Sequence, residues 1–258
     1  MQSGIKIPGK VVVVTGAASG IGEAIVRIFL DADAQGVIAV DKSKNLTHVF
    51  ESYKQKYRDK LQFVVGDVTL EQTAQTYTQL ALDHFGTVNV MINNAAVSFV
   101  KSVVDHTPEE WDTVMNVNVK SIYWSARYVV PVMKEHGGGL ILNTGSISGV
   151  VGLLSQGAYA PSKGAVNQMT RQMAIEFAHE NIRVNAICPG TVDTPLVHQS
   201  AKASGNEKQF MDSLEKGHPI GRIAKADEIA KFYLFMASDD ATFFTGSILM
   251  MDGGFTAQ

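Results

Sequence analysis

The sequence predicts one α/β domain, in which a parallel sheet is covered by helices on both faces. Apolar, strand-like runs alternate with helix-like runs along the whole chain, without a long linker or an internal repeat. The first strand-like run, residues 10–15, is followed at once by a glycine-rich turn and a helix-like run. At 258 residues the chain suits one large sheet of about seven strands, so we expect a single domain over residues 1–258.

The expected elements follow one another in a regular order. The predicted strands are apolar and cover residues 10–15, 36–41, 61–65, 88–92, 139–143, 182–187 and 247–251. The predicted helices cover residues 23–30, 45–60, 70–85, 108–134, 156–180 and 225–237. Thr107 before Pro108 predicts an N-terminal cap for the fourth of these helices. Residues 194–219 show neither pattern, so we expect a substrate loop there.

The turn after the first strand has the chemistry of a dinucleotide site. It reads Gly16-Ala-Ala-Ser-Gly20-Ile-Gly22. The glycines allow a pyrophosphate to approach the backbone, and the helix that follows presents unpaired N–H groups to it. A glycine cluster alone is weak evidence, but the strand before it and the helix after it strengthen the interpretation.

Asp41, at the end of the second predicted strand, favours NAD over NADP. An acidic residue about twenty residues beyond the glycines accepts hydrogen bonds from the adenosine ribose, and it would repel a 2′-phosphate. A turn-forming aspartate before Lys42 is the alternative interpretation. Lys42 itself is a cation that could tolerate a phosphate.

A candidate proton-transfer pair lies in the second half of the chain. Tyr159 and Lys163 are four residues apart, so on a helix they share one face. An ammonium about 4 Å from the phenol, at an effective dielectric of about 20, would favour phenolate by roughly 4 kcal/mol before desolvation is counted. This would bring Tyr159 toward the range of a general acid-base, although a solvated lysine beside a packed ring is the usual meaning of such a pair in isolation.

Together these motifs resemble the short-chain dehydrogenase/reductase family. The matching residues are Thr15-Gly16-x-x-x-Gly20-x-Gly22, Asn93-Asn94-Ala95-Ala96, Asn118, Ser146, Tyr159-x-x-x-Lys163 and Pro189-Gly190. They occur in the family's order over nearly the whole chain, and Ala96 replaces the glycine that is usual there. The resemblance implies a Rossmann-type fold and an NAD-dependent oxidoreductase. It also implies a homotetramer in which the helix from Pro108 and the helix of Tyr159 pair across a twofold axis.

The resemblance implies a role for each catalytic residue. Ser146 would hold the substrate oxygen, Tyr159 would transfer the hydroxyl proton, and Lys163 would bind the nicotinamide ribose and favour the Tyr159 phenolate. Asn118 would hold a water that links Lys163 to solvent. The cofactor-binding residues that it implies are Gly16, Ser19, Gly20, Ile21, Gly22, Asp41, Asp67, Val68, Asn94, Ala95, Tyr159, Lys163, Pro189, Val192 and Thr194. For Asp67, a helix cap is the alternative interpretation.

The substrate is expected to be a small, fairly polar secondary alcohol or ketone. The candidate contacts are Ser148, Gln156 and His198, and further candidates for the pocket wall are Ser98, Phe99, Leu153, Leu154, Val192 and Lys202. Loop similarity favours a hydroxy acid or a sugar-derived substrate, and a reductase of cyclic ketones or 3-oxoacyl thioesters is the alternative. A silent dinucleotide-binding regulator and a nucleotide-sugar epimerase also stay open. The complete Ser146, Tyr159 and Lys163 set argues against the regulator, and the short chain beyond Ile220 argues against the epimerase.

Composition argues against several other functions. A net charge of −3, with both signs spread along the chain, gives no basic stripe for nucleic acid. No apolar run reaches the ~18 residues of a membrane span, and the histidines show no metal-ligand spacing. The single cysteine, Cys188, forbids an internal disulfide and suits a reducing compartment. We therefore expect a cytoplasmic protein with a small-molecule substrate, no metal, and neither nucleic acid nor membrane as a partner.

Overall fold

The computed structural model describes residues 4–258 and confirms the predicted fold class. Within this range, seven strands form a sheet in the order β3-β2-β1-β4-β5-β6-β9, and every neighbouring pair is parallel. The strands are β1 (Val11–Thr15), β2 (Gly36–Asp41), β3 (Leu61–Val65), β4 (Val90–Asn93), β5 (Gly139–Thr144), β6 (Ile182–Pro189) and β9 (Ile248–Met251). The order reverses between β1 and β4, which is where ligands bind in doubly wound sheets.

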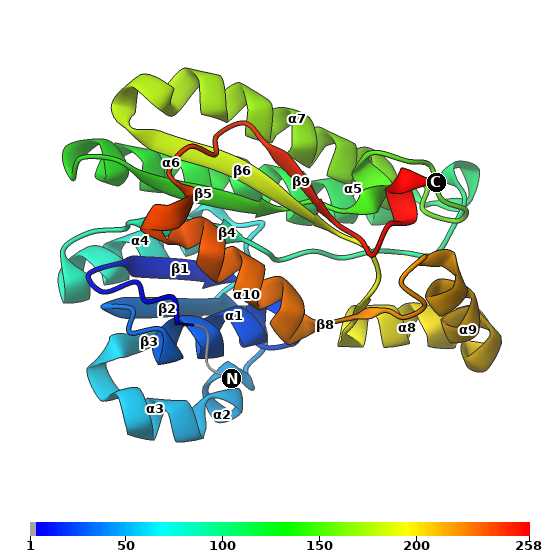
Figure 1. Cartoon of the computed structure of the whole chain (residues 1–258), viewed down its shortest axis with the longest axis horizontal. Helices are drawn as coiled ribbons and strands as arrows, with labels where there is room; N and C mark the ends of the chain where they lie inside the picture. The colour runs from blue at the N-terminus through cyan, green and yellow to red at the C-terminus, as the bar shows by residue number, and fades with distance from the viewer. Residues whose placement is uncertain (1–3) are drawn as a thin grey trace.

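Helices cover both faces of this sheet (Figure 1). They are α1 (Gly20–Asp31), α2 (Leu46–Val49), α3 (Glu51–Tyr57), α4 (Glu71–Phe85), α5 (Pro108–Met115), α6 (Ser121–Glu135), α7 (Tyr159–Phe177), α8 (Pro195–Ala203), α9 (Glu207–Gly217) and α10 (Ala226–Ala237). Val12 and Val14 of β1 pack with α1 and α10 on one face, whereas Val11 and Val13 pack with α4, α6 and α7 on the other. Because strand side chains alternate between faces, the all-apolar β1 contributes to both cores.

The long helix expected over residues 108–134 is present but interrupted. A π-helical turn, Asn116–Lys120, joins α5 to α6. The predicted cap is also present, because the Thr107 hydroxyl accepts a hydrogen bond from the Glu110 N–H and the Glu110 carboxylate accepts one from the Thr107 N–H. Single π turns inside α-helices are frequent at functional sites, and this one contains Asn118.

Two predicted segments differ from the structure. The helix expected over residues 45–60 divides into α2 and α3, because Phe50 leaves helical geometry and its ring is fully buried between Tyr53 and Phe63. The loop expected over residues 194–219 instead contains α8 and α9. Each of these helices begins at a capping residue, Thr194 followed by a proline for α8 and Asn206 for α9.

The helices α8 and α9 form a lobe beside the main sheet, at the carboxyl end of β6 (Figure 1). A small parallel sheet of β7 (Val192–Asp193) and β8 (Ala224–Lys225) joins the two ends of this segment to each other. In the described part of the chain, no helix combines the length and the apolar character that crossing a membrane requires.

Candidate active site

A cavity of about 500 Å³ lies at the carboxyl ends of the strands, where the strand order reverses. Most of the predicted site residues line it: Gly16, Ser19, Gly20, Ile21, Asp41, Asp67, Val68, Asn94, Ala95, Ser146, Ser148, Gln156, Tyr159, Lys163, Pro189, Val192 and Thr194. Three predicted residues, Gly22, Asn118 and His198, are outside the lining. The fold therefore brings the glycine turn and the Ser146, Tyr159 and Lys163 set to one cavity.

The glycine turn after β1 has the shape of a pyrophosphate cradle. Gly16 and Gly20 have φ angles of 67° and 58°, which L side chains rarely adopt. A Cβ on Gly22 would lie 2.1 Å from the Gly16 carbonyl oxygen, so a side chain there would displace the turn. Ser19, the N-cap of α1, makes no side-chain hydrogen bond to the helix, so the first N–H groups of α1 are available to a ligand. These residues fit a dinucleotide phosphate.

The carboxylate of Asp41 closes this turn at the end of β2. Its Oδ2 atom accepts a hydrogen bond from the Ala18 N–H at 3.0 Å, and its Oδ1 atom accepts one from the Ser43 N–H at 2.9 Å. Each oxygen keeps a second lone pair for a ribose hydroxyl. Lys42 also lines the cavity, so a cation accompanies this carboxylate.

Asp67 after β3 lines the same end of the cavity, and the structure gives it a local partner as well. Its Oδ1 atom accepts hydrogen bonds from the backbone N–H and the hydroxyl of Thr69, at 2.9 and 2.8 Å. These bonds make a turn that fixes the carboxylate, and Thr73 donates to the Asp67 carbonyl. The helix-cap alternative for Asp67 is wrong, because Leu70 is the N-cap of α4, and Asp67 instead fixes a turn with Thr69 while it lines the cavity.

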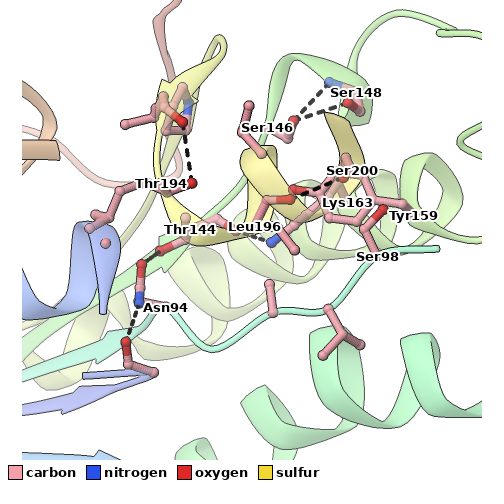
Figure 2. A pocket seen from close by; sticks show the side chains of 18 of the residues that line it. Asn94, Ser98, Thr144, Ser146, Ser148, Tyr159, Lys163, Thr194, Leu196 and Ser200 are labelled. Carbon is pink, nitrogen blue, oxygen red and sulfur yellow. Dashed lines mark hydrogen bonds between the residues drawn. The ribbon is translucent and has the colours of Figure 1, made fainter. Parts of the chain in front are cut away.

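Asn94 links the glycine turn to Thr144, the last residue of strand β5. Its amide donates hydrogen bonds to the Thr15 and Gly16 carbonyls at 3.0 and 3.2 Å, and its Oδ1 atom accepts one from the Thr144 hydroxyl at 3.4 Å. Thr144 also bonds to the buried hydroxyl of Tyr233 on α10 at 2.7 Å. Figure 2 shows this chain of contacts from Asn94 through Thr144 to Lys163. Thr144 is a site residue that sequence reasoning missed, because its place between Asn94 and Tyr233 depends on tertiary contacts.

Ser146 and Tyr159 both line the cavity, Ser146 from the loop after β5 and Tyr159 from the start of α7. Ser146 follows β5, and its hydroxyl bonds to the N–H and the hydroxyl of Ser148, both at 3.1 Å (Figure 2). Tyr159 is the first residue of α7, and burial raises the pKa of its phenol to about 12, although a hydrogen bond with Ser146 opposes the rise. The proximity of Ser146 therefore offsets part of the effect of burial on the Tyr159 pKa.

Lys163, one turn along α7, is only 2% exposed. Its Nζ atom donates a 2.7 Å hydrogen bond to the Thr144 carbonyl and lies 5.5 Å from the centre of the Tyr159 ring. Burial lowers the pKa of Lys163 to about 8. The expected lowering of the Tyr159 pKa by Lys163 is therefore wrong for this structure, because desolvation is the largest influence on both groups and raises the pKa of Tyr159.

The hydrogen bonds of the Asn118 side chain go to residues other than Lys163. Its Oδ1 atom accepts a hydrogen bond from the Val97 N–H at 2.9 Å, and its Nδ2 atom donates to the Val97 carbonyl and the Ser162 hydroxyl, both at 3.0 Å. The side chain thus fixes the chain that leaves β4 against α7. The water-relay role of Asn118 stays a prediction, and the Asn118 side chain has a positioning role that the sequence did not reveal.

The lobe closes the substrate end of the cavity with residues that the sequence did not predict: Leu196, Val197, Ser200, Phe210 and Leu214. Figure 2 shows Leu196 and Ser200 of α8 beside this space. His198 pairs with Asp193 at 2.7 Å on the surface, outside the cavity lining, so its role in substrate binding stays a prediction. Phe99 and Lys202 also lie outside the lining. The i, i+4 spacing of Phe210 and Leu214 was the available signal for an apolar helical face.

The fold and the cavity together define an oxidoreductase of the dinucleotide-binding α/β class. Among residues 4–258, no group of histidine, cysteine, aspartate or glutamate side chains is arranged to hold a metal ion. Tyr159 and Lys163 both line this cavity.

Comparison with known proteins identifies the family. The family described as enoyl-(acyl carrier protein) reductase matches residues 16–256. The D-beta-hydroxybutyrate dehydrogenase of Rhizobium meliloti is 33% identical, with 96% of this chain and 99% of that protein covered. The cyclohexanol dehydrogenase of an Acinetobacter species is also 33% identical, with 98% of this chain and 97% of that protein covered.

Solved structures agree with this assignment. L-sorbose reductase from Gluconobacter frateurii, in complex with NADPH and L-sorbose, superposes with a TM-score of 0.91 at 31% identity, and each chain is covered completely. The chain therefore belongs to the short-chain dehydrogenase/reductase family, as its motifs predicted.

Proposed function

We propose that this protein is an NAD-dependent dehydrogenase/reductase that interconverts a small, fairly polar secondary alcohol and its ketone. One observation carries the proposal: Ser146, Tyr159 and Lys163 line the same cavity as the glycine turn and Asp41. A dinucleotide held at the turn and a substrate held at Ser146 would thus meet in one enclosed space. A silent regulatory protein would have no need of the complete set.

The residues of this chain would divide the work of proton transfer. Ser146 would donate a hydrogen bond to the substrate oxygen and fix it beside the Tyr159 hydroxyl. In oxidation, Tyr159 would take the hydroxyl proton of the substrate, and in reduction it would return the proton. A bound nicotinamide dinucleotide supplies hydride transfer, and its oxidised ring is a cation that favours the Tyr159 phenolate. Lys163 would bind the ribose, for which it must leave or share its bond to the Thr144 carbonyl.

The choice of NAD rests on Asp41. Both of its oxygens are held by backbone N–H groups and point a fixed negative charge at the ribose end of the turn. A 2′-phosphate would be repelled there, whereas ribose hydroxyls would be accepted. L-sorbose reductase, a structural neighbour, was crystallised with NADPH, so the preference for NAD is argued here from the neighbourhood of Asp41 and not from this relative.

We also propose a homotetramer in a reducing, cytoplasmic setting. Large apolar side chains are exposed on three separate elements: Tyr123 on α6, Ile175 on α7 and Met250 on β9. Exposed apolar surface of this kind favours association between copies of the chain. The reducing setting is supported by Cys188, which is buried as a free thiol.

A panel of secondary alcohols tests the proposed reaction. The purified protein is mixed with NAD or NADP and each alcohol, and reduced cofactor is followed by absorbance. We expect turnover of small alcohols with NAD, at a higher kcat/KM than with NADP. If the dinucleotide binds but no alcohol in a broad panel is oxidised and no ketone is reduced, the protein is a dinucleotide-binding protein of another kind.

A further inference from the structure

The substrate end of the cavity has an unusual charge distribution. The ionisable lining residues within the described chain are Asp41, Lys42, Asp67, Tyr159 and Lys163. The first three follow β2 and β3, and three strand spacings separate β2 from β5, which is about 14 Å. Their charges therefore belong to the adenosine end.

Lys163 is the one cation near the reacting atoms among the described lining residues, and its ammonium already has other partners. It is buried, it donates to the Thr144 carbonyl, and its proposed ligand is the cofactor ribose. Cations on neighbouring segments lie outside the lining: Lys101 pairs with Glu110 at 2.6 Å, Arg222 pairs with Glu228 at 2.8 Å, and Lys202 on α8 is exposed. A substrate carboxylate or phosphate would thus lose water without gaining a counter-charge, which is costly.

The cavity instead offers uncharged hydrogen-bonding groups on an apolar wall. The Ser98, Ser148 and Ser200 side chains and Gln156 share the lining with apolar residues, among them Leu196 and Phe210. Gln156 lies three residues before Tyr159 and forms an isolated parallel β-bridge with Lys101. Its Oε1 atom is buried in the wall without a hydrogen-bond partner, so the accessible Nε2 group, which has no acceptor among the described residues, is the donor that the amide offers to the cavity. An oxygen of the substrate could accept this hydrogen bond.

We infer that the substrate is an uncharged molecule with a second oxygen, and that Gln156 recognises this second oxygen as a specificity-determining residue. A diol or a hydroxyketone on a small ring or short alkyl chain meets both conditions. The apolar wall would cover its carbon skeleton. This inference rests on the proposed function and deepens it, and it replaces the hydroxy acid that loop similarity favoured.

The comparisons alone do not decide between charged and uncharged substrates. One relative at 33% identity is named for hydroxybutyrate, and another at the same identity is named for cyclohexanol. The side chains of this cavity therefore carry the distinction. A matched pair of substrates tests it: methyl 3-hydroxybutyrate is neutral, and 3-hydroxybutyrate differs by its carboxylate. We expect kcat/KM to be at least about 100-fold higher for the ester, and a preference for the acid would overturn the inference.

A second experiment tests Gln156 itself. Gln156→Leu removes the amide while keeping the size of the side chain. We expect kcat/KM for trans-cyclohexane-1,2-diol to fall about tenfold, as for one lost hydrogen bond, and kcat/KM for cyclohexanol to change by less than about twofold. Gln199→Leu is the matched control, because Gln199 is exposed on α8 and outside the cavity lining. Equal losses for both alcohols would remove the assignment of Gln156.

Ligand binding gives a readout that does not need turnover. The protein is loaded with NADH, and the diol and cyclohexanol are titrated by calorimetry. We expect the diol to bind about tenfold more tightly to the wild type, and the two alcohols to bind equally to Gln156→Leu. If this difference is present but no alcohol is ever oxidised, the substrate inference stands and the proposed function fails. If turnover occurs without this difference, the proposed function stands and the inference about Gln156 fails.

Discussion

In the proposed mechanism the Tyr159 hydroxyl transfers the substrate proton, while most of the proposed cofactor contacts lie elsewhere in the cavity. Tyr159→Phe removes this hydroxyl and leaves the ring in place. We expect NAD affinity within about threefold of the wild type and kcat reduced by ~10²–10⁴, the loss typical of a missing general acid-base. Fluorescence titration with NADH and steady-state kinetics measure the two quantities. Full activity in Tyr159→Phe would remove Tyr159 from the mechanism.

Lys163 illustrates the cost of a buried charge. Its pKa falls from 10.5 to about 8 on folding, which corresponds to a destabilisation on the order of 3 kcal/mol below pH 8. Between pH 8 and 10.5 the unfolded chain binds more protons than the folded chain, so this cost declines as the pH rises and is absent above pH 10.5.

We therefore expect Lys163→Met to abolish turnover and to raise the Tm of the cofactor-free protein at pH 7. Removing the buried charge would recover about 3 kcal/mol, and losing the hydrogen bond to the Thr144 carbonyl would cost about 1 kcal/mol. The net stabilisation of the fold would therefore be about 2 kcal/mol. This corresponds to roughly 4–8 °C. Calorimetry at pH 7 and pH 10 measures it, and Lys208→Met on exposed α9 is the control. A lower Tm in Lys163→Met at pH 7 would contradict this account.

The proposed preference for NAD over NADP depends on the carboxylate of Asp41. Asp41→Ala removes the negative charge at the ribose end and leaves Lys42 beside the cavity. We expect kcat/KM with NAD to fall and kcat/KM with NADP to rise. The ratio of kcat/KM with NAD to kcat/KM with NADP should therefore decrease by at least about tenfold. Kinetics with both cofactors measure it. Equal use of NAD and NADP by the unaltered protein would contradict the assignment before any mutation is made.

At the scale of elements, the lobe of α8 and α9 depends on one buried histidine. The Nε2 atom of His218 accepts a hydrogen bond from the Thr191 N–H at 3.0 Å, and its Nδ1 atom donates to the Leu214 carbonyl at 2.7 Å. The ring packs on Phe255 with centroids 5.3 Å apart. His218 therefore links the end of α9, the chain after β6 and the C-terminal segment.

We expect His218→Ala to destabilise the protein by about 1–3 kcal/mol, because the Thr191 N–H loses its buried partner. The KM for the alcohol should rise, since Leu214 and Phe255 line the substrate end, whereas NAD affinity should change little. His218→Asn keeps an acceptor and should restore part of both properties. Thermal denaturation and kinetics measure the effects, and an unchanged alcohol KM in a destabilised His218→Ala would show that His218 is structural alone.

The elements also show what the sequence could and could not predict. Strand boundaries were close because each strand is a continuous apolar run between turn residues, as in β1 and β2. The π turn at Asn118 was missed, because the local sequence there is ordinary helix and the turn depends on contacts with Val97 and Ser162. The helices α8 and α9 are short and polar outside, so packing on the cavity rather than periodicity determines them.

The same distinction applies within the site. Motif spacing placed Tyr159 and Lys163 on one helical face, and the structure has them there. Their pKa values could not follow from spacing, because burial decides them. His198 was expected in the pocket, and its pairing with Asp193 was invisible in a sequence that gave no sign of α8.

At the scale of the whole molecule, the exposed apolar side chains predict association. Ile175 is 80% exposed on α7, and Phe243 is fully exposed near β9, which is costly for an isolated chain in water. We expect a homotetramer at micromolar concentration, with a mass of about four chains by analytical ultracentrifugation. Ile175→Lys should shift the distribution toward smaller species, because it would bury like charges in facing copies. A monomer in the unaltered protein would contradict the tetramer.

The small β7–β8 sheet has a consequence for how such a protein could diversify. The chain enters the lobe through Val192–Asp193 and returns through Ala224–Lys225, so the segment that contains α8 and α9 begins and ends at paired strands. The glycine turn, Asp41 and the Ser146, Tyr159 and Lys163 set all lie outside it. If Thr194, the predicted cofactor contact at the start of α8, is kept, a relative's segment could be exchanged between these two strands, and a new alcohol preference could arise while the dinucleotide site is retained.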